Sequence, residues 1–308
     1  MSRLGWIFTV VCVAAGTSVA HLGADEPVAA EPPAAGWPAQ AVDTPTLSWQ
    51  DDYLAAVEAA RSQGKMLLIY FHDRGDQPGP DPFELETLCD PEVAERLAEL
   101  VRVKAPTDAC VRLNGETVVL LNHGSFAEME GMPGVAMIDF AHHDAPYCSR
   151  VVGAFPFLEG RRHTPQQMKV ILDLPPGTLT QRTLIYAVRT HPDHPASTEG
   201  EIHSELVREA ESHSLEQARM RLQGHHRWDT RFRRISGYLP NGLTAKEVCA
   251  ESWPGEGLLE AAIECVRCWR TSPGHWGAVR TRHDYYGYDL KRGTNGVWYA
   301  TGIFASRD

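Results

Sequence analysis

The chain has 308 residues, 43% of them hydrophobic, and a formal net charge of -11 at pH 7. This length is typical of two domains, and the hydrophobic content excludes a disordered chain. The negative charge argues against nucleic acid and anionic membranes as partners of the whole chain, because both require basic surfaces.

The N-terminal segment has the pattern of a secretory signal. Arg3 supplies a positive charge, residues 6–15 form a short apolar core, and residues 18–20 are small at the expected cleavage point. The apolar run is too short for a comfortable membrane span. We therefore expect 1–20 to be a signal peptide, and the mature chain to be exported (periplasmic or secreted) without a transmembrane segment. Residues 21–48, rich in Ala, Pro and Glu, are expected to be a linker.

Residues 49–174 alternate helical and strand patterns. Gly64 is a helix stop signal, and Asp90 and Thr164 each precede a proline, as an N-cap precedes the first helical position. The alternation predicts an α/β domain with a central sheet. The expected elements are a helix within 49–65, a strand at 66–71, a helix at 90–100, strands at 100–105 and 134–140, and a helix at 164–174.

The composition changes at residues 174–178, where two prolines and a glycine interrupt both patterns. A long helical stretch covers 201–224, and aromatic, alternating segments at 276–290 and 295–305 are typical of strands. Helices followed by terminal strands predict a second, α+β domain over 178–305.

Four segments of the first domain resemble the extracytoplasmic branch of the thioredoxin superfamily: GKMLLIYF, DPEVAERL, LVRVK and GMPGVAMIDF. The resemblance implies a thioredoxin-like fold with a Cys-x-x-Cys redox pair ahead of the helix that begins near Asp90. Counted back from Asp90, the two thiol positions fall on Gln77 and Pro80. Neither side chain forms a thiolate, so we expect this domain to be redox-inactive. Pro133 matches the cis-proline of the family, which would hold the loop shape with or without catalysis.

Residues 178–305 resemble the CAP superfamily of cysteine-rich secretory, antigen 5 and pathogenesis-related-1 proteins. The matching segments are ESHSLEQARMRLQGHHRW, KEVCAESW, CWRTSPGHWGAV and YYGYDLKRGTNGVWYATGIFA. The third is the most specific, because it carries the bacterial pattern Trp-x-x-Ser-Pro-Gly-His. The resemblance implies an αβα sandwich.

The CAP cleft is lined by two histidines and two acidic residues. The first histidine carries over to His225, with His226 as the alternative, the first acid to Glu247 and the second histidine to His275. The second acid does not carry over, since Ser272 stands near its place. Two imidazoles and a carboxylate can bind Zn²⁺ or another divalent metal and leave a position open. They can also polarise a water, or simply hold two loops together.

Six cysteines lie beyond the signal: Cys89, Cys110, Cys148, Cys249, Cys265 and Cys268. Their even number permits disulfides in an oxidising compartment but does not fix the pairing. Among the first three we expect a structural disulfide or buried free thiols. In the second domain we expect one disulfide from Cys249 to Cys265 or Cys268, or plain core packing. Cys265 and Cys268 have the spacing Cys-x-x-Cys, but they lie inside a helical pattern, whereas a redox pair lies at the start of a helix.

One segment departs from the acidic character of the chain. The stretch RMRLQGHHRWDTRFRR, residues 219–234, is rich in arginine. It is either an anion-binding patch or, as is commoner, a solvated face with salt bridges.

These patterns predict an exported, non-catalytic protein that binds a cell-envelope or extracellular ligand. The alternative is a metal-assisted hydrolase that uses the CAP cleft, and thiol–disulfide exchange is disfavoured by Gln77 and Pro80. No cofactor is certain; Zn²⁺ or another divalent metal is the candidate.

Overall fold

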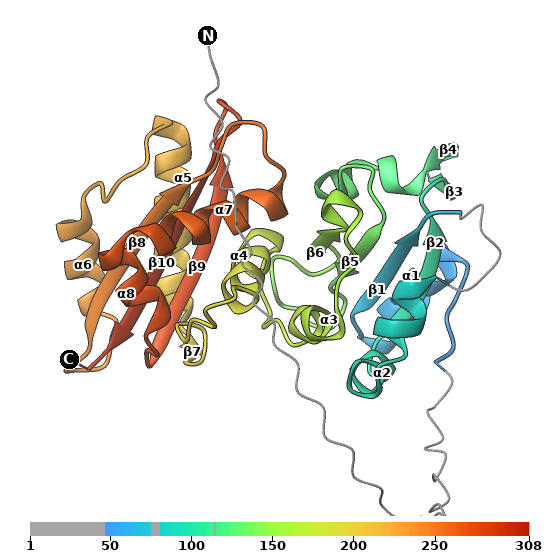
Figure 1. Ribbon diagram of the computed structural model, residues 1–308, viewed down its shortest axis with the longest axis horizontal. Helices are drawn as coiled ribbons and strands as arrows, with labels where there is room; N and C mark the ends of the chain where they lie inside the picture. Colours follow the sequence, from blue (N-terminus) through green and yellow to red (C-terminus); the bar gives the residue numbers. More distant parts are fainter. Residues whose placement is uncertain (1–46, 75–80, 114, 308) are drawn as a thin grey trace, which may run out of the picture. The chain divides into compact units, whose positions relative to one another are not determined.

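The computed structural model describes residues 47–74, 81–113 and 115–307, which belong to one compact unit. Its first sheet has the order β2 (Val101–Pro106), β1 (Leu67–His72), β5 (Gly134–Ile138) and β6 (Val151–Pro156) (Figure 1). β1 is parallel to β2 and antiparallel to β5, and β5 is antiparallel to β6. All residues of β5 are buried, which places it in the centre of the core. A separate hairpin consists of β3 (Cys110–Leu113) and β4 (Glu116–Val119).

The helices of this half begin and end where the sequence signals predict. Asp90 and Thr164 accept hydrogen bonds from the first backbone N–H groups of their helices, and Gly64 ends the first helix with φ of 60°. The expected helices and strands are thus confirmed as elements, whereas the sequence pattern does not predict β6 or the hairpin. The helices are α1 (Tyr53–Gln63), α2 (Pro91–Ala98), α3 (Pro165–Leu172), the short π-helix η1 (Phe83–Leu88), and the 3₁₀ helices η2 (Leu120–Asn122), η3 (Gly124–Met129) and η4 (Leu158–Gly160).

Pro133 does not have the expected cis peptide bond, because no cis peptide occurs in the described part of the chain. The chain reverses instead at Glu130 and Gly131, which both have positive φ. Gly134 then brings β5 against β6, since a Cβ at this position would lie 2.4 Å from the carbonyl oxygen of Phe155. Gln77 and Pro80, where the resemblance predicts the positions of a redox pair, lie outside the described residues.

The second sheet has the order β7 (Glu201–Ile202), β9 (Tyr285–Arg292), β10 (Trp298–Ser306) and β8 (Thr244–Glu251). Helix α5 (Ser204–Met220) packs on β9 and β10, so closely that a Cβ on Gly287 would lie 2.4 Å from the backbone of Leu206. Helices α7 (Leu258–Thr271) and α8 (Pro273–Arg280) cover the other face, and α6 (Trp228–Ser236) packs on α5 and β8 (Figure 1). The sheet is therefore the middle of three layers.

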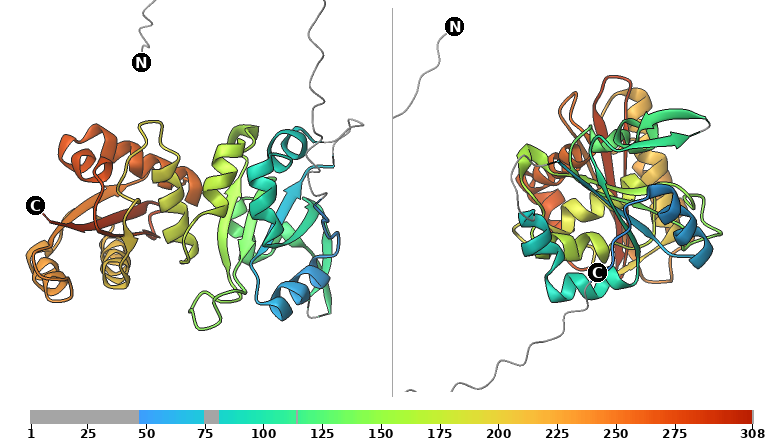
Figure 2. Two further views of the ribbon diagram at one scale, coloured as in Figure 1. Left: turned by 90° about the horizontal axis from the view of Figure 1, so that it is seen from below. Right: turned by 90° about the vertical axis from the view of Figure 1, so that its right-hand side faces the viewer.

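Helix α4 (Leu179–Arg189) lies between the two sheets and packs on β6, α7 and β9 (Figures 1 and 2). Arg182 is 3% exposed, and its guanidinium donates to the carbonyl oxygens of Val152, Leu174 and Pro175 at 2.8–2.9 Å. One apolar core continues from the first sheet through α4 to α7. The Pro-rich segment 174–178 thus connects two parts of the chain that share one continuous core. Separate folding of the two halves stays a prediction. Within the described ranges, no helix combines the length and apolarity that crossing a bilayer requires.

Candidate functional site

The three residues that the sequence predicts to form a cleft come from three different elements. His225 lies in the loop between α5 and α6, Glu247 lies on β8, and His275 lies in the first turn of α8. Along β8, Val248 and Ala250 belong to the core shared with α7. Because side chains alternate along a strand, Glu247 points to the opposite face, toward α5.

These side chains lie in contact with one another. The Nδ1 of His225 is 2.9 Å from Oε1 of Glu247, and its Nε2 is 3.2 Å from Nε2 of His275. A carboxylate only accepts, so Nδ1 of His225 carries the proton. In the neutral ring, Nε2 therefore presents its lone pair toward His275. The His225 side chain is 43% exposed and that of Glu247 is 1% exposed, so the histidines form the mouth and the glutamate the floor.

Arg231 on α6 holds the floor of this cleft. Its guanidinium bonds both carboxylate oxygens of Glu247, at 2.6–3.0 Å. Burial alone raises the pKa of Glu247, but the hydrogen bonds from His225 and Arg231 and the charge of Arg231 outweigh it, and the pKa lies below its usual value. Glu247 is therefore an ionised, fully bonded carboxylate that is not free to accept a proton from a ligand.

Two residues of α5 fix the loop that carries His225. The Nε2 of His213 donates to the carbonyl oxygen of Gly224 at 2.9 Å, and Oε1 of Gln217 accepts from the N–H of Gly224 at 3.1 Å. Burial lowers the pKa of His213, which keeps its ring neutral. Sequence reasoning missed His213, Gln217 and Arg231; the available signal was the four-residue spacing of His213 and Gln217 on one helical face.

Two predicted positions do not join the cleft. His226 points away, with Nε2 3.3 Å from the carbonyl oxygen of Leu222, so the first histidine is His225. Ser272 is the N-cap of α8, and its carbonyl accepts from the N–H of Trp276 at 2.8 Å. Among the described residues, no hydrogen bond joins the Ser272 side chain to the cleft.

The expected disulfide from Cys249 to Cys265 or Cys268 is not formed, since all six described cysteines are free thiols. The expectation of a disulfide or buried thiols among the first three is wrong as well, because Cys89 and Cys110 are exposed and Cys148 is partly exposed. The sheet separates Cys249 from Cys265 and Cys268. Cys249 lies beside Glu247 on β8, with Sγ 3.7 Å from Nδ1 of His225. Cys265 and Cys268 lie on α7 against the core of the opposite face. The alternative of core packing fits Cys265, which is fully buried. Burial raises the pKa of all three thiols, which disfavours redox chemistry.

The two imidazoles fit a divalent metal, but the carboxylate does not. Tetrahedral zinc with Zn–N bonds of about 2.0–2.1 Å places two ligand nitrogens about 3.3 Å apart, close to the observed 3.2 Å between Nε2 of His225 and Nε2 of His275. The oxygens of Glu247 instead contact Nδ1 of His225 and Arg231. This carboxylate is placed to orient a ligand histidine, so the expectation that Glu247 is itself a ligand does not fit.

A second donor group, His213, Glu247 and Cys249, has its ligand atoms within 4.8 Å of one another. It does not fit a metal. Arg231 occupies both oxygens of Glu247, and His213 already donates through the nitrogen that faces them.

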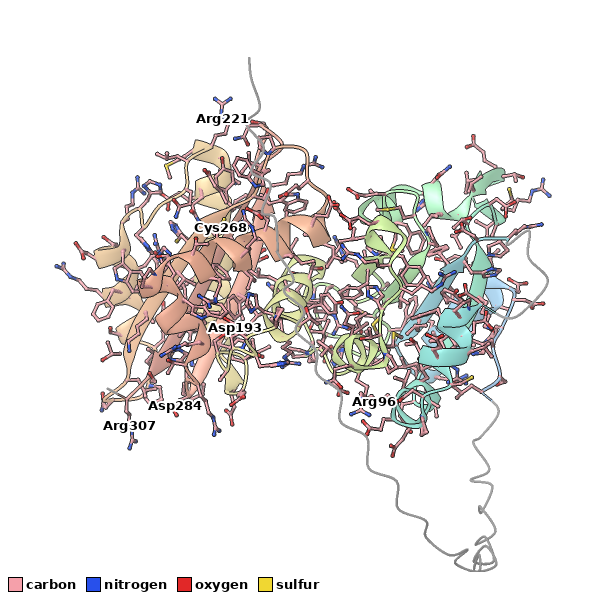
Figure 3. The ribbon with its side chains drawn as sticks, viewed as in Figure 1. Arg96, Asp193, Arg221, Cys268, Asp284 and Arg307 are labelled. Atoms are coloured by element: carbon pink, nitrogen blue, oxygen red, sulfur yellow. The ribbon has the colours of Figure 1, made fainter. Side chains whose placement is uncertain are left out.

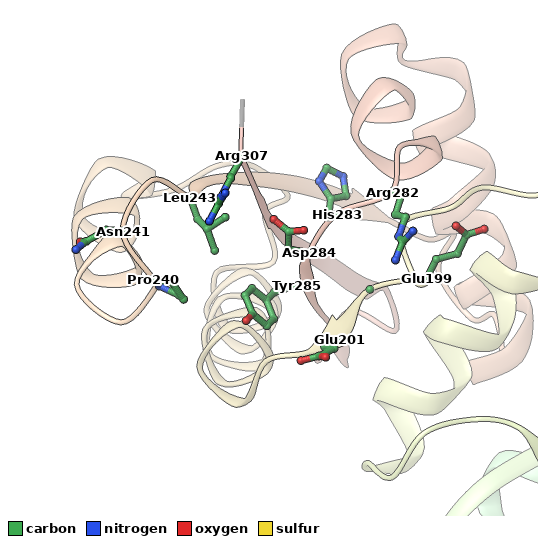
Figure 4. A pocket seen from close by; sticks show the side chains of 11 residues that line it. Glu199, Glu201, Pro240, Asn241, Leu243, Arg282, His283, Asp284, Tyr285 and Arg307 are labelled. Carbon is green, nitrogen blue, oxygen red and sulfur yellow. The ribbon is translucent and has the colours of Figure 1, made fainter.

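The pocket in Figure 4, of about 560 Å³, lies elsewhere, where β7 meets β9. It holds charges of both signs, among them Glu201, Asp284, Arg282 and Arg307, and no cleft residue lines it. The cleft is therefore separate from this pocket.

No protein-family model and no curated protein matches this sequence. Among solved structures, an outer surface protein from Borrelia burgdorferi is similar at 20% identity, over 35% of this chain and 78% of that chain, with a TM-score of 0.29. A similarity this low supports no inference about fold or function.

Proposed function

We propose that the protein is exported and binds a cell-envelope or extracellular ligand without catalysis, through the cleft formed by His225 and His275. Its first half is a redox-inactive thioredoxin-like domain and its second half a CAP-like domain. The observation that carries the proposal is the 3.2 Å separation of the two Nε2 atoms, in a partly exposed mouth above a fixed carboxylate.

The chemistry of the pair suits binding better than turnover. Burial, together with the nearby His225, lowers the pKa of His275, so the ring of His275 favours its neutral form, which offers a nitrogen lone pair. Glu247 is held by Arg231 and cannot act as a mobile general base. His225 and His275 would hold a divalent metal, which would supply an open coordination position for a ligand oxygen.

The alternative function is a metal-assisted hydrolase. It would require a base to accept a proton from water, but Glu247 is held by Arg231 and both imidazoles would be metal ligands. The geometry supplies two metal ligands where catalytic zinc sites commonly have three, and this favours binding over hydrolysis.

Calorimetry with Zn²⁺ tests the proposal on the wild type and on His275→Ala. We expect binding heat from the wild type and none from this variant, because one of two ligands is removed. His226→Ala is the matched control: it removes the neighbouring imidazole outside the cleft and should bind like the wild type. Equal heats from all three proteins would contradict the metal-binding cleft, and hydrolysis of ester substrates that is lost in His275→Ala would favour the alternative.

A further inference from the structure

A groove between α5 and α6 is a second candidate binding site. Its volume is about 550 Å³, and none of His225, Glu247 and His275 lines it. Four arginines line it and one acidic residue, Glu216. The lining residues are Ser212, Leu215, Glu216, Arg219 and Met220 from α5, and Arg227, Thr230, Arg231 and Arg234 from α6 and the residue before it.

The charge around this groove opposes that of the whole chain. Residues 219–234 contain six arginines and a single acid, Asp229, in a protein of net charge -11. Arg221, at the end of α5, extends away from the ribbon (Figure 3). An anionic partner would therefore be attracted to this face and repelled by most other parts of the chain.

The arginines differ in their availability. Arg231 is held by Glu247, and Arg234 forms an ion pair with Glu209. The Arg227 side chain is 79% exposed, and its ion pair with Glu216 is long, with 3.6 Å between Nη1 and Oε1. Arg219 is exposed and forms no ion pair with any described residue. Arg219 is thus available to bind a carboxylate in bidentate fashion, and Arg227 can do so by exchanging its long, exposed ion pair with Glu216.

Apolar side chains accompany these charges. Leu215 and Met220, both in the lining, are 36% and 43% exposed, and Leu222 in the next loop is 55% exposed. Exposed leucine and methionine beside arginine suit a partner that has both apolar and acidic groups. None of the lining residues is aromatic, so the groove offers no stacking platform for nucleic acid bases.

We propose that this groove is a docking site for an acidic, partly apolar peptide segment of a partner protein. Two helices form its walls, and residues 212–220 give a wall about 12 Å long, which matches about four residues of extended chain. A concave site favours a single chain over a flat membrane surface. The carboxylates would bind Arg219 and Arg227, and apolar side chains would pack on Leu215 and Met220. The groove shares Arg231 with the floor of the histidine cleft, but among the described residues neither Arg219 nor Arg227 forms a hydrogen bond or ion pair with Glu247.

Fluorescence anisotropy with a short labelled peptide of alternating glutamate and leucine tests the proposal. We expect saturable binding that weakens as salt rises, and a loss of about tenfold or more in affinity in the double variant Arg219→Glu/Arg227→Glu. The matched control is Arg282→Glu/Arg307→Glu, which changes the net charge equally at two exposed arginines of the other pocket and should bind like the wild type.

Three results would overturn the proposal. The groove variant would bind the peptide as well as the wild type, or the control variant would lose affinity to the same extent, which indicates charge alone. Alternatively, the peptide would not bind while vesicles containing phosphatidylglycerol bind in an Arg219- and Arg227-dependent manner, which would assign the groove to an anionic lipid surface.

Discussion

Glu247 is the residue on which the cleft depends, and its charge is maintained by its neighbours. It is almost wholly buried, yet it accepts from His225 and from two nitrogen atoms of Arg231. A buried carboxylate is stable only with such partners. The geometry of His225, and through it of His275, therefore follows from an ion pair that lies beneath the exposed part of the site.

Replacing Arg231 with Met should destabilise the protein by about 3–5 kcal/mol, because it leaves the Glu247 carboxylate buried and without its guanidinium. Urea unfolding measures the change. The double variant Arg231→Met/Glu247→Met is the control, since removal of both charges should restore most of the lost free energy of unfolding. A double variant as unstable as the single one would show that packing, rather than the stranded charge, is responsible.

The charge of Glu247 also makes stability depend on pH. Its folded-state pKa is below the unfolded value of 4.5, so its contribution is fully present above that value and is lost as pH falls through the folded pKa. We expect the difference in free energy of unfolding between the wild type and Glu247→Gln to be large at pH 7 and to shrink below pH 4.5. A difference that is independent of pH would contradict this role.

At the scale of elements, the ends of helices could be predicted from the sequence, because a cap depends on neighbours along the chain. Examples are the N-caps at Asp90 and Thr164 and the helix end at Gly64. The trans peptide bond of Pro133 was not predicted; the positive-φ residues before this proline are Glu130 and Gly131. The role of Arg231 could not be predicted from the sequence, because its partner Glu247 is 16 residues away and the two meet only through the packing of α6 on β8.

Helix α4 depends on Arg182, whose guanidinium lies between the two sheets. Burial lowers the pKa of Arg182 to about 10, so it remains charged at neutral pH. Arg182→Ala would leave the carbonyl oxygens of Val152, Leu174 and Pro175 without this donor, and we expect a loss of about 3 kcal/mol or more. Thermal unfolding measures it.

Arg280→Ala is the matched control for Arg182→Ala, because Arg280 is exposed. It should change stability by less than about 0.5 kcal/mol. Arg182→Lys should not rescue the loss, since an ammonium lacks the planar fork that reaches several carbonyls. Rescue by Lys would mean that charge alone suffices at this position.

For the whole molecule, the question is where the first folding unit ends. The predicted boundary at 174–178 precedes α4, but α4 contributes much to the first half. The hydroxyl of Tyr186 lies 3.4 Å from Nδ1 of His163, and its ring packs on Phe155 at 4.9 Å between centroids. Among the described residues, the hydrogen bonds of the Arg182 guanidinium all go to the first half: to the carbonyl oxygens of Val152, Leu174 and Pro175 and to Sδ of Met137.

We therefore expect that the first half needs α4 to fold. A fragment of residues 47–190 should unfold cooperatively in urea, whereas one of residues 47–174 should not, because β6 and α3 then lose the apolar cover of Leu184, Ile185 and Tyr186. Residues 178–307 provide the reciprocal fragment, in which Asp289 keeps its bond from Thr180. Equal cooperativity of the two N-terminal fragments would place the boundary at 174–178. If none of the fragments folds, the continuous core makes residues 47–307 a single cooperative unit.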